Sequence, residues 1–427
     1  MTYNRIFFGV AALVLLIVAA LYTVTQDRVL WYDGHPYDSD EYYRMALQVA
    51  AGSTISVGKP FGYRVAAPTI VGRFFPDNIM AGFLGLNLFF GLAILVITAL
   101  LFYRCFRSHW TIVISLALLI ANPHGPVRFT KFFPVFTDAG ALFFIIAILY
   151  VGISLRPTPW IVVSILGFVG VFFREIVLIA PLSLLFGSLW RVFKDHEGAG
   201  VSLRLVSPVL SAAAGIGVTH LLVQPLGEYT FSSHALFSLT RHIQHPSILL
   251  AAPLTVYGPV ILLLLIRARQ TTAFFTRHPE LACYACLIGM LAVFGGTHTD
   301  RFFFWAFPAL LPAVGVVTEE WIRERGWSIR IAVLLIPLVL AQVLAFRAFH
   351  QLPNSNFNSL DNPGRPGLVL FAPYGEGLTL AQMHAAFMSA MQRRIVLIEY
   401  GSLLVWLLLA GRALQALPQK HAVLTKK

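Results

Sequence analysis

The run IMAGFLGLNLFFGLAILVITALLFY, residues 79–103, contains no charged side chain. A helix needs roughly 20 consecutive apolar residues to cross the hydrocarbon core of a bilayer, and similar runs recur along the chain. Of the 427 residues, 58% are hydrophobic and only 12% are charged, whereas soluble domains carry about 25% charged residues. Most of this surface must therefore face lipid. The sequence predicts an all-α, polytopic membrane protein with one integral membrane domain over residues 1–427.

About twelve membrane-spanning helices are predicted from these runs. Cytoplasmic loops carry an excess of Lys and Arg, and here basic residues follow the even-numbered spans, so both termini are expected in the cytoplasm. The predicted spans are 6–24, 79–103, 111–122, 138–155, 160–173, 175–190, 205–224, 247–266, 280–296, 303–318, 330–346 and 394–412. The orienting residues are Arg104, Arg107, Arg156, Arg191, Lys194, Arg267, Arg269, Arg323 and Arg325.

The formal charge of +12 is explained by basic loops against an anionic inner leaflet. Because no Lys/Arg run of the nucleic-acid-binding type occurs, we expect membrane lipids rather than nucleic acid as partners. The three cysteines, Cys105, Cys283 and Cys286, cannot build a disulfide framework. Cys283 and Cys286 have C-x-x-C spacing inside an apolar run, where we expect small core residues. His220, inside a predicted span, is also expected to be a packed core residue.

The predicted external side gathers most of the polar sequence. Its first loop, 25–78, and its last loop, 347–393, are long, as loops that carry function often are. Residues 225–246 form another predicted loop, in which Arg241 and His242 are expected to be ordinary loop residues. The external side is therefore where a site is expected.

The first external loop contains Asp38-Ser39-Asp40-Glu41-Tyr42-Tyr43-Arg44. Residues 38–49 have helical spacing, and Asp38 with Glu41 three residues later fits a capping-box-like start. Capping does not require Asp40. A carboxylate at the membrane–water boundary can have a raised proton affinity and act as a general base.

Aromatic and charged residues on the same side are further candidates. Tyr42 and Tyr43 suit either anchoring at the membrane interface or stacking against a sugar ring. Charges between apolar runs are costly and are usually paired or functional. For the charged residues among them, a salt bridge between helices and contact with a ligand remain alternatives. Because all of them are predicted on the external side of the membrane, a shared site is favoured. These residues are Tyr63 and Arg64, Arg128 and Lys131, Asp138, Arg174 and Glu175, and His298, Asp300 and Arg301.

Asp40-Glu41-Tyr42-Tyr43-Arg44-Met45-Ala46 resembles the Asp-Glu-x-x-Tyr-x-Ala type of pattern in the first external loop of GT-C fold glycosyltransferases. These polytopic enzymes include the protein O-mannosyltransferase-like and aminoarabinose-transferase-like groups. Pro60-Phe61-Gly62-Tyr63-Arg64 followed by Pro68 is similar to a stretch of bacterial GT-C-like membrane proteins. The resemblance implies an enzyme of a bacterial inner membrane with an external, periplasmic active site.

The resemblance also implies a reaction. An inverting transferase would move a hexosyl or pentosyl group from a polyprenyl-phosphate donor to a hydroxyl of a glycan, lipid or protein acceptor. Asp40 would act as the base, with Asp38 or Glu41 as second choice, and arginines would stabilise the departing phosphate. The phosphate candidates are Arg174, Arg301 and Arg128 in that order, then Lys131 and Arg64. The candidates for substrate contact are Tyr42, Tyr43, Tyr63, Glu175, His298 and Asp300.

No cofactor is firmly implied, and a divalent metal remains an alternative. Asp38-x-Asp40 is similar to the metal-binding DxD of nucleotide-sugar transferases, but those act on cytosolic nucleotide sugars and this loop is predicted to face outward. His298-x-Asp300 offers further ligands, although two acids and a histidine at undetermined distances make a weak zinc pattern.

Two other functions remain open. A lipid-linked glycan ligase or polymerase is a variant within the enzyme class, and the long late loop at 347–393 is typical of it. A secondary transporter or flippase belongs to another class, for which internal inverted repeats, broken helices and charges near mid-membrane are expected. The sequence shows no repeat and its charges gather on one side, which favours the transferase.

Overall fold

Helices make up all the regular structure in the described part of the chain. The computed structural model describes residues 2–25, 38–122, 124–126, 133–155, 157–195, 203–223, 226–227, 230–296, 299–325, 336–342, 345, 388 and 390–416. Within these ranges the one β-type pairing is a bridge between Gly58 and Leu226. The all-α prediction is therefore confirmed for them.

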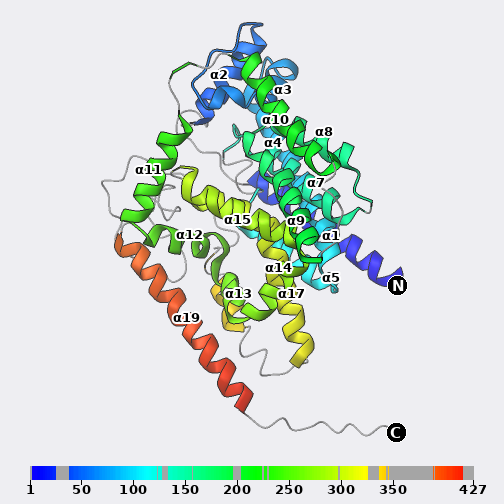
Figure 1. The fold of residues 1–427 in the computed structure, drawn as a ribbon, viewed down its shortest axis with the longest axis vertical. Helices are drawn as coiled ribbons and strands as arrows, with labels where there is room; N and C mark the ends of the chain where they lie inside the picture. Colours follow the sequence, from blue (N-terminus) through cyan, green and yellow to red (C-terminus); the bar gives the residue numbers. More distant parts are fainter. Residues whose placement is uncertain are drawn as a thin grey trace.

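The elements run in chain order as follows (Figure 1). They are α1 (Thr2–Thr25), α2 (Asp38–Ala50), η2 (Phe61–Tyr63), α3 (Ala66–Phe74), α4 (Ile79–Cys105), α5 (His109–Ala121), α7 (Asp138–Ser154), α8 (Trp160–Gly170), η3 (Glu175–Leu178), α9 (Ile179–Asp195), α10 (Leu203–Leu222), α11 (Phe231–Gln244), α12 (Ser247–Tyr257), η4 (Gly258–Ile261), α13 (Leu262–Ile266), α14 (Ala268–Arg277), α15 (Pro279–Phe294), α16 (Thr299–Trp305), α17 (Phe307–Arg325) and α19 (Ala390–Ala416). The η elements are short 3₁₀ helices.

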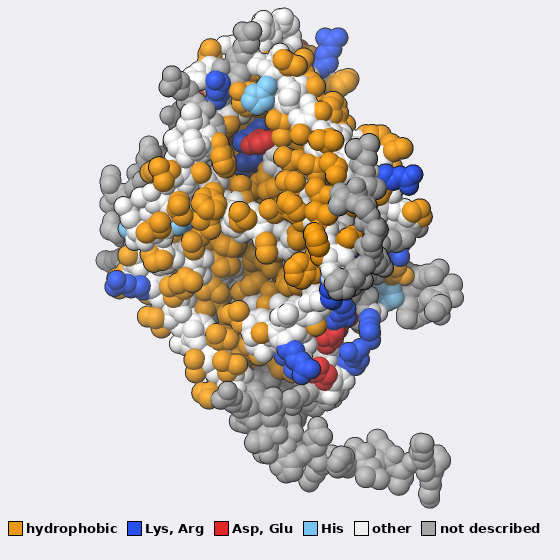
Figure 2. Space-filling view, in the orientation of Figure 1, with side chains coloured by type: hydrophobic (Ala, Val, Ile, Leu, Met, Phe, Trp, Pro, Cys, Tyr) orange, Lys and Arg blue, Asp and Glu red, His pale blue; other side chains and the backbone are white. Residues whose placement is uncertain are grey.

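The apolar helices indicate an integral membrane protein. In the described residues, four stretches are long and apolar enough to cross a bilayer, and a fifth is added if the bent pair α16–α17 is one span. Shorter apolar helices lie within α1, α5, α7, α8 and α15. Hydrophobic side chains cover the middle of the face in Figure 2. Twelve spans remain a prediction. The four stretches are Ile79–Cys105, Glu175–Lys194, Arg204–Leu222 and Ser247–Ile266.

Helix α7 lies inside the bundle, in contact with α4, α8 and α9. Two glycines permit this close packing. A Cβ atom on Gly140 would lie 2.3 Å from the ring of Phe173, and one on Gly152 would lie 2.4 Å from Leu184. Because α7 is central and begins at Asp138, this carboxylate is placed at one end of the bundle interior.

The first predicted external loop folds into helices that pack on that same end. Helix α2 confirms the helical spacing seen from residue 38 onward, and it buries Tyr42. Helix α3, which the sequence did not predict, packs so closely on α2 that a Cβ on Gly72 would lie 2.3 Å from the carbonyl oxygen of Ala46. The backbone N–H of Ala66 donates to the carbonyl of Phe172 at 3.0 Å. This bond ties the loop to the turn between α8 and η3.

Basic residues of the loops that were predicted to be cytoplasmic contact acidic residues of α15 and α17. Figure 1 shows α14 and α17 towards the opposite end of the long axis from α2 and α3, and Figure 2 shows acidic and basic side chains gathered in that lower region. The contacts are Arg267 with Glu324, Arg277 with Glu320 at 3.0 Å, Arg191 with Glu280 at 2.8 Å, and the backbone N–H groups of Arg107 and Ser108 with Glu319 at 3.0 and 2.8 Å.

Two details of the sequence reading were wrong. Arg241 and His242 lie on helix α11 rather than in a loop. His220 is exposed in the last turn of α10, where its ring stacks on Tyr63 at 3.9 Å between centroids. The predicted span 247–266 corresponds to one of the four stretches that are long and apolar enough to cross a bilayer. Within it η4 follows α12, and Gly258 adopts a φ of +66°, a conformation that favours glycine. Most of the predicted last loop, 347–393, lies outside the described residues.

The two ends of the bundle give a test of orientation. We expect Ser53→Cys, exposed after α2, to react with a membrane-impermeant thiol reagent only from outside the cell. Thr272→Cys, exposed on α14, should react only after the membrane is opened. Both would be measured on a background without native cysteines. Labelling of both from the same side would contradict the predicted topology.

Candidate active site

Asp138 holds two arginines that come from distant parts of the chain. Its Oδ1 atom pairs with Arg174, which precedes η3, and its Oδ2 atom accepts from Nε of Arg301 on α16 at 2.5 Å. The side chains of all three are largely buried. Buried charges are tolerated when they are paired and hydrogen-bonded, so the three residues form one electrostatic unit.

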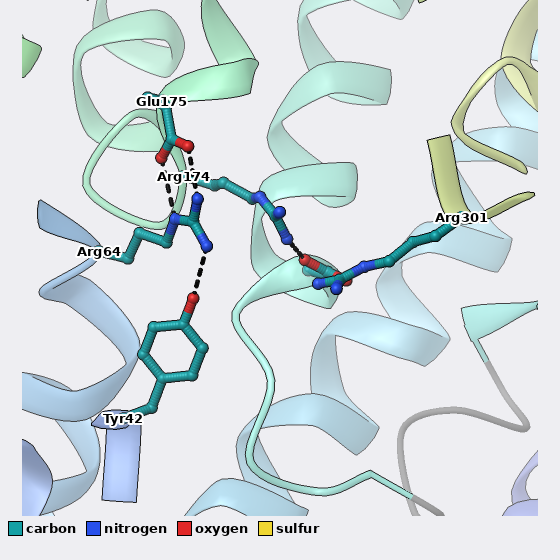
Figure 3. Close-up of polar contacts among 6 residues, drawn as sticks. Tyr42, Arg64, Arg174, Glu175 and Arg301 are labelled. Carbon is teal, nitrogen blue, oxygen red and sulfur yellow. Dashed lines mark hydrogen bonds and ion pairs between the residues drawn. The ribbon is translucent and has the colours of Figure 1, made fainter. Parts of the chain in front are cut away.

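Arg64 forms a second unit beside the first (Figure 3). Its Nε and Nη2 atoms donate to the two carboxylate oxygens of Glu175 at 3.0 and 2.6 Å, and its Nη1 donates to the hydroxyl of Tyr42 at 2.7 Å. Burial alone would lower the pKa of Arg64, but Glu175 and Tyr42 raise it well above its ordinary value. Arg64 is therefore a permanent cation that joins α2 to the bundle.

The two units adjoin because Arg174 and Glu175 are consecutive residues. Figure 3 shows the guanidinium groups of Arg64, Arg174 and Arg301 converging on one region from separate elements. Three guanidinium groups face the two carboxylates of Asp138 and Glu175. The cluster thus carries one excess positive charge, which suits it to an anionic ligand.

Aromatic rings flank each guanidinium group. The Cζ atom of Arg174 lies 5.3 Å from the ring of Trp305, that of Arg301 lies 4.7 Å from Phe136, and that of Arg64 lies 5.6 Å from Phe61. Stacking of this kind is favourable and restricts the orientation of the planar group. The arginines are therefore fixed by packing as well as by charge.

Asp300 lies next to Arg301 but faces another part of the bundle. It is fully buried and accepts from the hydroxyl of Thr255 on α12 at 2.6 Å. The preceding residue, Thr299, contacts Nε2 of His242 at 2.9 Å. These contacts fix α16 against α11 and α12, and so position Arg301.

The acids of the first loop lie in the first turn of α2, where the helix dipole stabilises negative charge. Asp40 forms an ion pair with Arg44 at 3.0 Å and its side chain is 40% exposed. Glu41 contacts the same Arg44 at 2.5 Å and accepts from the backbone N–H of Gly58 at 3.2 Å. In the Asp-Glu-x-x-Tyr-x-Ala type of pattern, the tyrosine position falls on Arg44.

The structure thus brings together some of the predicted residues and leaves others apart. At 100° per residue, Asp40 and Tyr42 point to nearly opposite faces of α2, so Asp40 faces away from the ring that contacts Arg64. Asp38 and Tyr43 are half-buried on the same helix. The clustered predictions are Tyr42, Arg64, Arg174, Glu175 and Arg301, whereas Arg128, Lys131 and His298 lie outside the described residues.

Sequence reasoning undervalued Asp138 and missed Trp305 and Thr255. It placed Asp138 among the external charged sites, as a salt-bridge or ligand residue, but did not select it as a site residue, although an acid opening an apolar run was an available signal. Trp305 and Thr255 gave no signal, because their roles depend on contacts between segments far apart in the sequence.

The described residues contain no group of three or more His, Cys, Asp or Glu side chains that could hold a metal ion. Both carboxylates of the arginine cluster are paired with guanidinium groups. The positive charge of these groups would repel a metal cation bound to the same carboxylates. The His298-x-Asp300 alternative includes a residue outside the described ranges.

Comparison with known proteins gives one structural likeness. No protein-family model and no curated protein matches the sequence. Among solved structures, the chain is similar to the oligosaccharyltransferase of Archaeoglobus fulgidus, crystallised with zinc and sulfate, with a TM-score of 0.47 and 14% sequence identity. The match covers 81% of this chain and 54% of that one, so the chain spans about half the length of that protein.

The shared carboxylate gives a test of stability. Asp138→Asn leaves two buried guanidinium groups without their counter-ion, and breaking a buried pair costs about 3–5 kcal/mol. We expect a loss of that size in the free energy of unfolding in detergent. The control, Glu324→Gln, removes a carboxylate that is 44% exposed and should cost at most about 1 kcal/mol. Equal losses would show that Asp138 is not a structural centre.

Proposed function

We propose that this chain is a GT-C-type membrane glycosyltransferase that uses a polyprenyl-phosphate-linked sugar. The observation that carries the proposal is the buried cluster of Arg64, Arg174 and Arg301, with one positive charge in excess. It lies where the helices of the first loop meet the bundle, which is where the sequence resemblance places the catalytic loop.

The arginines have the chemistry that a phosphate leaving group requires. Guanidinium groups bind two phosphate oxygens at once and remain charged. When the bond between the anomeric carbon and the phosphate oxygen breaks, negative charge gathers on the phosphate. Arg174 and Arg301, fixed on Asp138, would stabilise that charge without having to reorganise.

Asp40 is the proposed base. The acceptor hydroxyl oxygen attacks the anomeric carbon from the side opposite the phosphate, the phosphate leaves with the bonding electrons, and the hydroxyl proton passes to Asp40. This single in-line displacement inverts the anomeric centre. Partial exposure leaves Asp40 accessible to an acceptor, and Arg44 holds it in place. Because Asp40 faces away from Tyr42 and Arg64 in this structure, the step also requires that α2 turn this carboxylate towards the donor. Glu41 is a weaker candidate because it also accepts a backbone N–H, and Asp38 remains a second choice.

The remaining parts of the proposal concern substrates and setting. Tyr43 and Tyr63 offer rings for contact with a hexosyl or pentosyl group, and Tyr42 orients Arg64. The acceptor is a glycan, a lipid or a protein, and the reaction takes place at the external, periplasmic face of a bacterial inner membrane. A divalent metal is retained only as an alternative, and a lipid-linked glycan ligase or polymerase would use the same cluster.

One observation favours a transporter as a second candidate. Discontinuous helices are typical of secondary transporters, and in the described residues helix α16 is bent by 60° from α17. A transporter would move its substrate across proteoliposomes without breaking a glycosidic bond.

The base assignment is tested by substitution. We expect Asp40→Asn to lower kcat for sugar transfer by at least about 100-fold, as loss of a general base does, with unchanged expression and donor binding. Transfer would be followed with purified protein, radiolabelled polyprenyl-phosphate sugars and membrane extracts as acceptor. Asp77→Asn, in the loop before α4, serves as the matched control. Full activity of Asp40→Asn would remove Asp40 as the base.

Substitution of Arg301, one of the proposed phosphate-binding arginines, is a separate test. Arg301→Gln should weaken donor binding and lower kcat together, because the cation contacts the phosphate in both the bound and the reacting state. Transport of an intact substrate into proteoliposomes, with no transfer product, would instead support the second candidate.

A further inference from the structure

The three arginines of the cluster differ in how firmly their counter-ions are held. Asp138 is shared by Arg174 and Arg301 and is only 19% exposed. Glu175 forms its ion pair with Arg64, and its side chain is 45% exposed although that of Arg64 is 6% exposed. One ion pair is thus enclosed, and the other opens on one side.

Residues other than Glu175 also orient the guanidinium group of Arg64. The hydroxyl of Tyr42 accepts from its Nη1, and the ring of Phe61 lies beneath its guanidinium group. The edge formed by Nε and Nη2 is the one that Glu175 occupies. A guanidinium edge that holds two carboxylate oxygens is also the edge that holds two phosphate oxygens. Glu175 therefore occupies the position that a phosphate would take.

Exposed apolar residues belong to a helix that packs beside this pair. Helix α10 contacts both η2 and η3, which flank Arg64 and Glu175. Its last turn exposes Leu221 and Leu222. In the upper part of Figure 2, an acidic side chain lies beside basic ones with hydrophobic side chains around them. A headgroup on a lipid chain could reach Arg64 from this side.

The geometry points to Glu175 as an exchangeable counter-ion of Arg64, displaced by the phosphate of a lipid that enters between α10 and the η2–η3 contact. The inference rests on the proposed function, because it names the arginine that the donor meets first. In the empty protein, Glu175 prevents Arg64 from being a buried, unpaired charge. In the loaded protein, the phosphate replaces it, and the two ion pairs of Asp138 with Arg174 and Arg301 remain intact.

The experiment measures binding of a sugar-free polyprenyl phosphate to the full-length protein in detergent, by native mass spectrometry and by ligand-induced thermal stabilisation. Glu175→Gln keeps the size of the side chain and removes the competing charge. We expect it to bind the lipid phosphate about tenfold more tightly than the wild type, which corresponds to 1.4 kcal/mol, and to unfold at a lower temperature when empty. Arg64→Gln should lose most of the binding.

The controls separate the sources of the effect. Glu324→Gln removes a carboxylate of nearly equal exposure, 44%, from an ion pair around α14 and α17, and it should leave the affinity unchanged. The corresponding polyprenyl alcohol should bind no more tightly to Glu175→Gln than to the wild type. Tighter binding of inorganic phosphate but not of the lipid would overturn the lipid route. Glu175→Asp, whose shorter side chain reaches Arg64 less well, should give an intermediate gain and serves if Glu175→Gln does not fold.

An unchanged or weaker affinity in both Glu175 variants would show a purely structural ion pair and overturn the inference. That result is distinguishable from failure of the proposed function, because this assay requires no sugar transfer. If the protein transfers sugar but Glu175→Gln binds the lipid with unchanged affinity, the proposed function holds and the displacement of Glu175 is overturned. If Glu175→Gln binds the lipid more tightly but the protein transfers no sugar, the displacement holds and the proposed function is overturned.

Discussion

The carboxylate of Asp138 pairs with two guanidinium groups inside a largely apolar bundle. Removing charges from water costs several kcal/mol for each ion, and that cost is offset here because Arg174 and Arg301 approach opposite oxygens of one acid. The arrangement places Asp138 at the start of the central helix α7 and Arg174 in the turn between α8 and η3. It places Arg301 on α16, which is bent away from α17. Much of the architecture around the cluster serves to keep these three charges together.

The same constraint gives the cluster its chemical character. Arg64 adds a third cation, and Glu175 adds a second acid that is far more exposed than Asp138. An enclosed unit and an open unit therefore lie side by side, joined by consecutive residues of one turn. An arrangement of this kind holds permanent positive charge where a ligand can meet it, which is the preorganisation that stabilises a developing phosphate anion.

Apolar length and helical spacing were sufficient to predict several of the helices, because both follow from local sequence, but α3 and α11 were not predicted. The run at 79–103 became α4, and the spacing from Asp38 became α2. The predicted external grouping of Arg64, Arg174, Glu175 and Arg301 also agrees with their contacts. Their partners were not predictable, since Arg64 meets Glu175 across 111 residues of sequence and no periodicity encodes such a pair. His220 was misjudged because the end of α10 carries it to the surface.

The most direct test of the central claim is a cryo-electron microscopy structure of the full-length protein with a bound polyprenyl phosphate. The account predicts phosphate density in contact with the guanidinium groups of Arg64, Arg174 and Arg301, with the prenyl chain passing beside α10. Density for the phosphate elsewhere on the protein, with the cluster unchanged and its ion pairs intact, would contradict it.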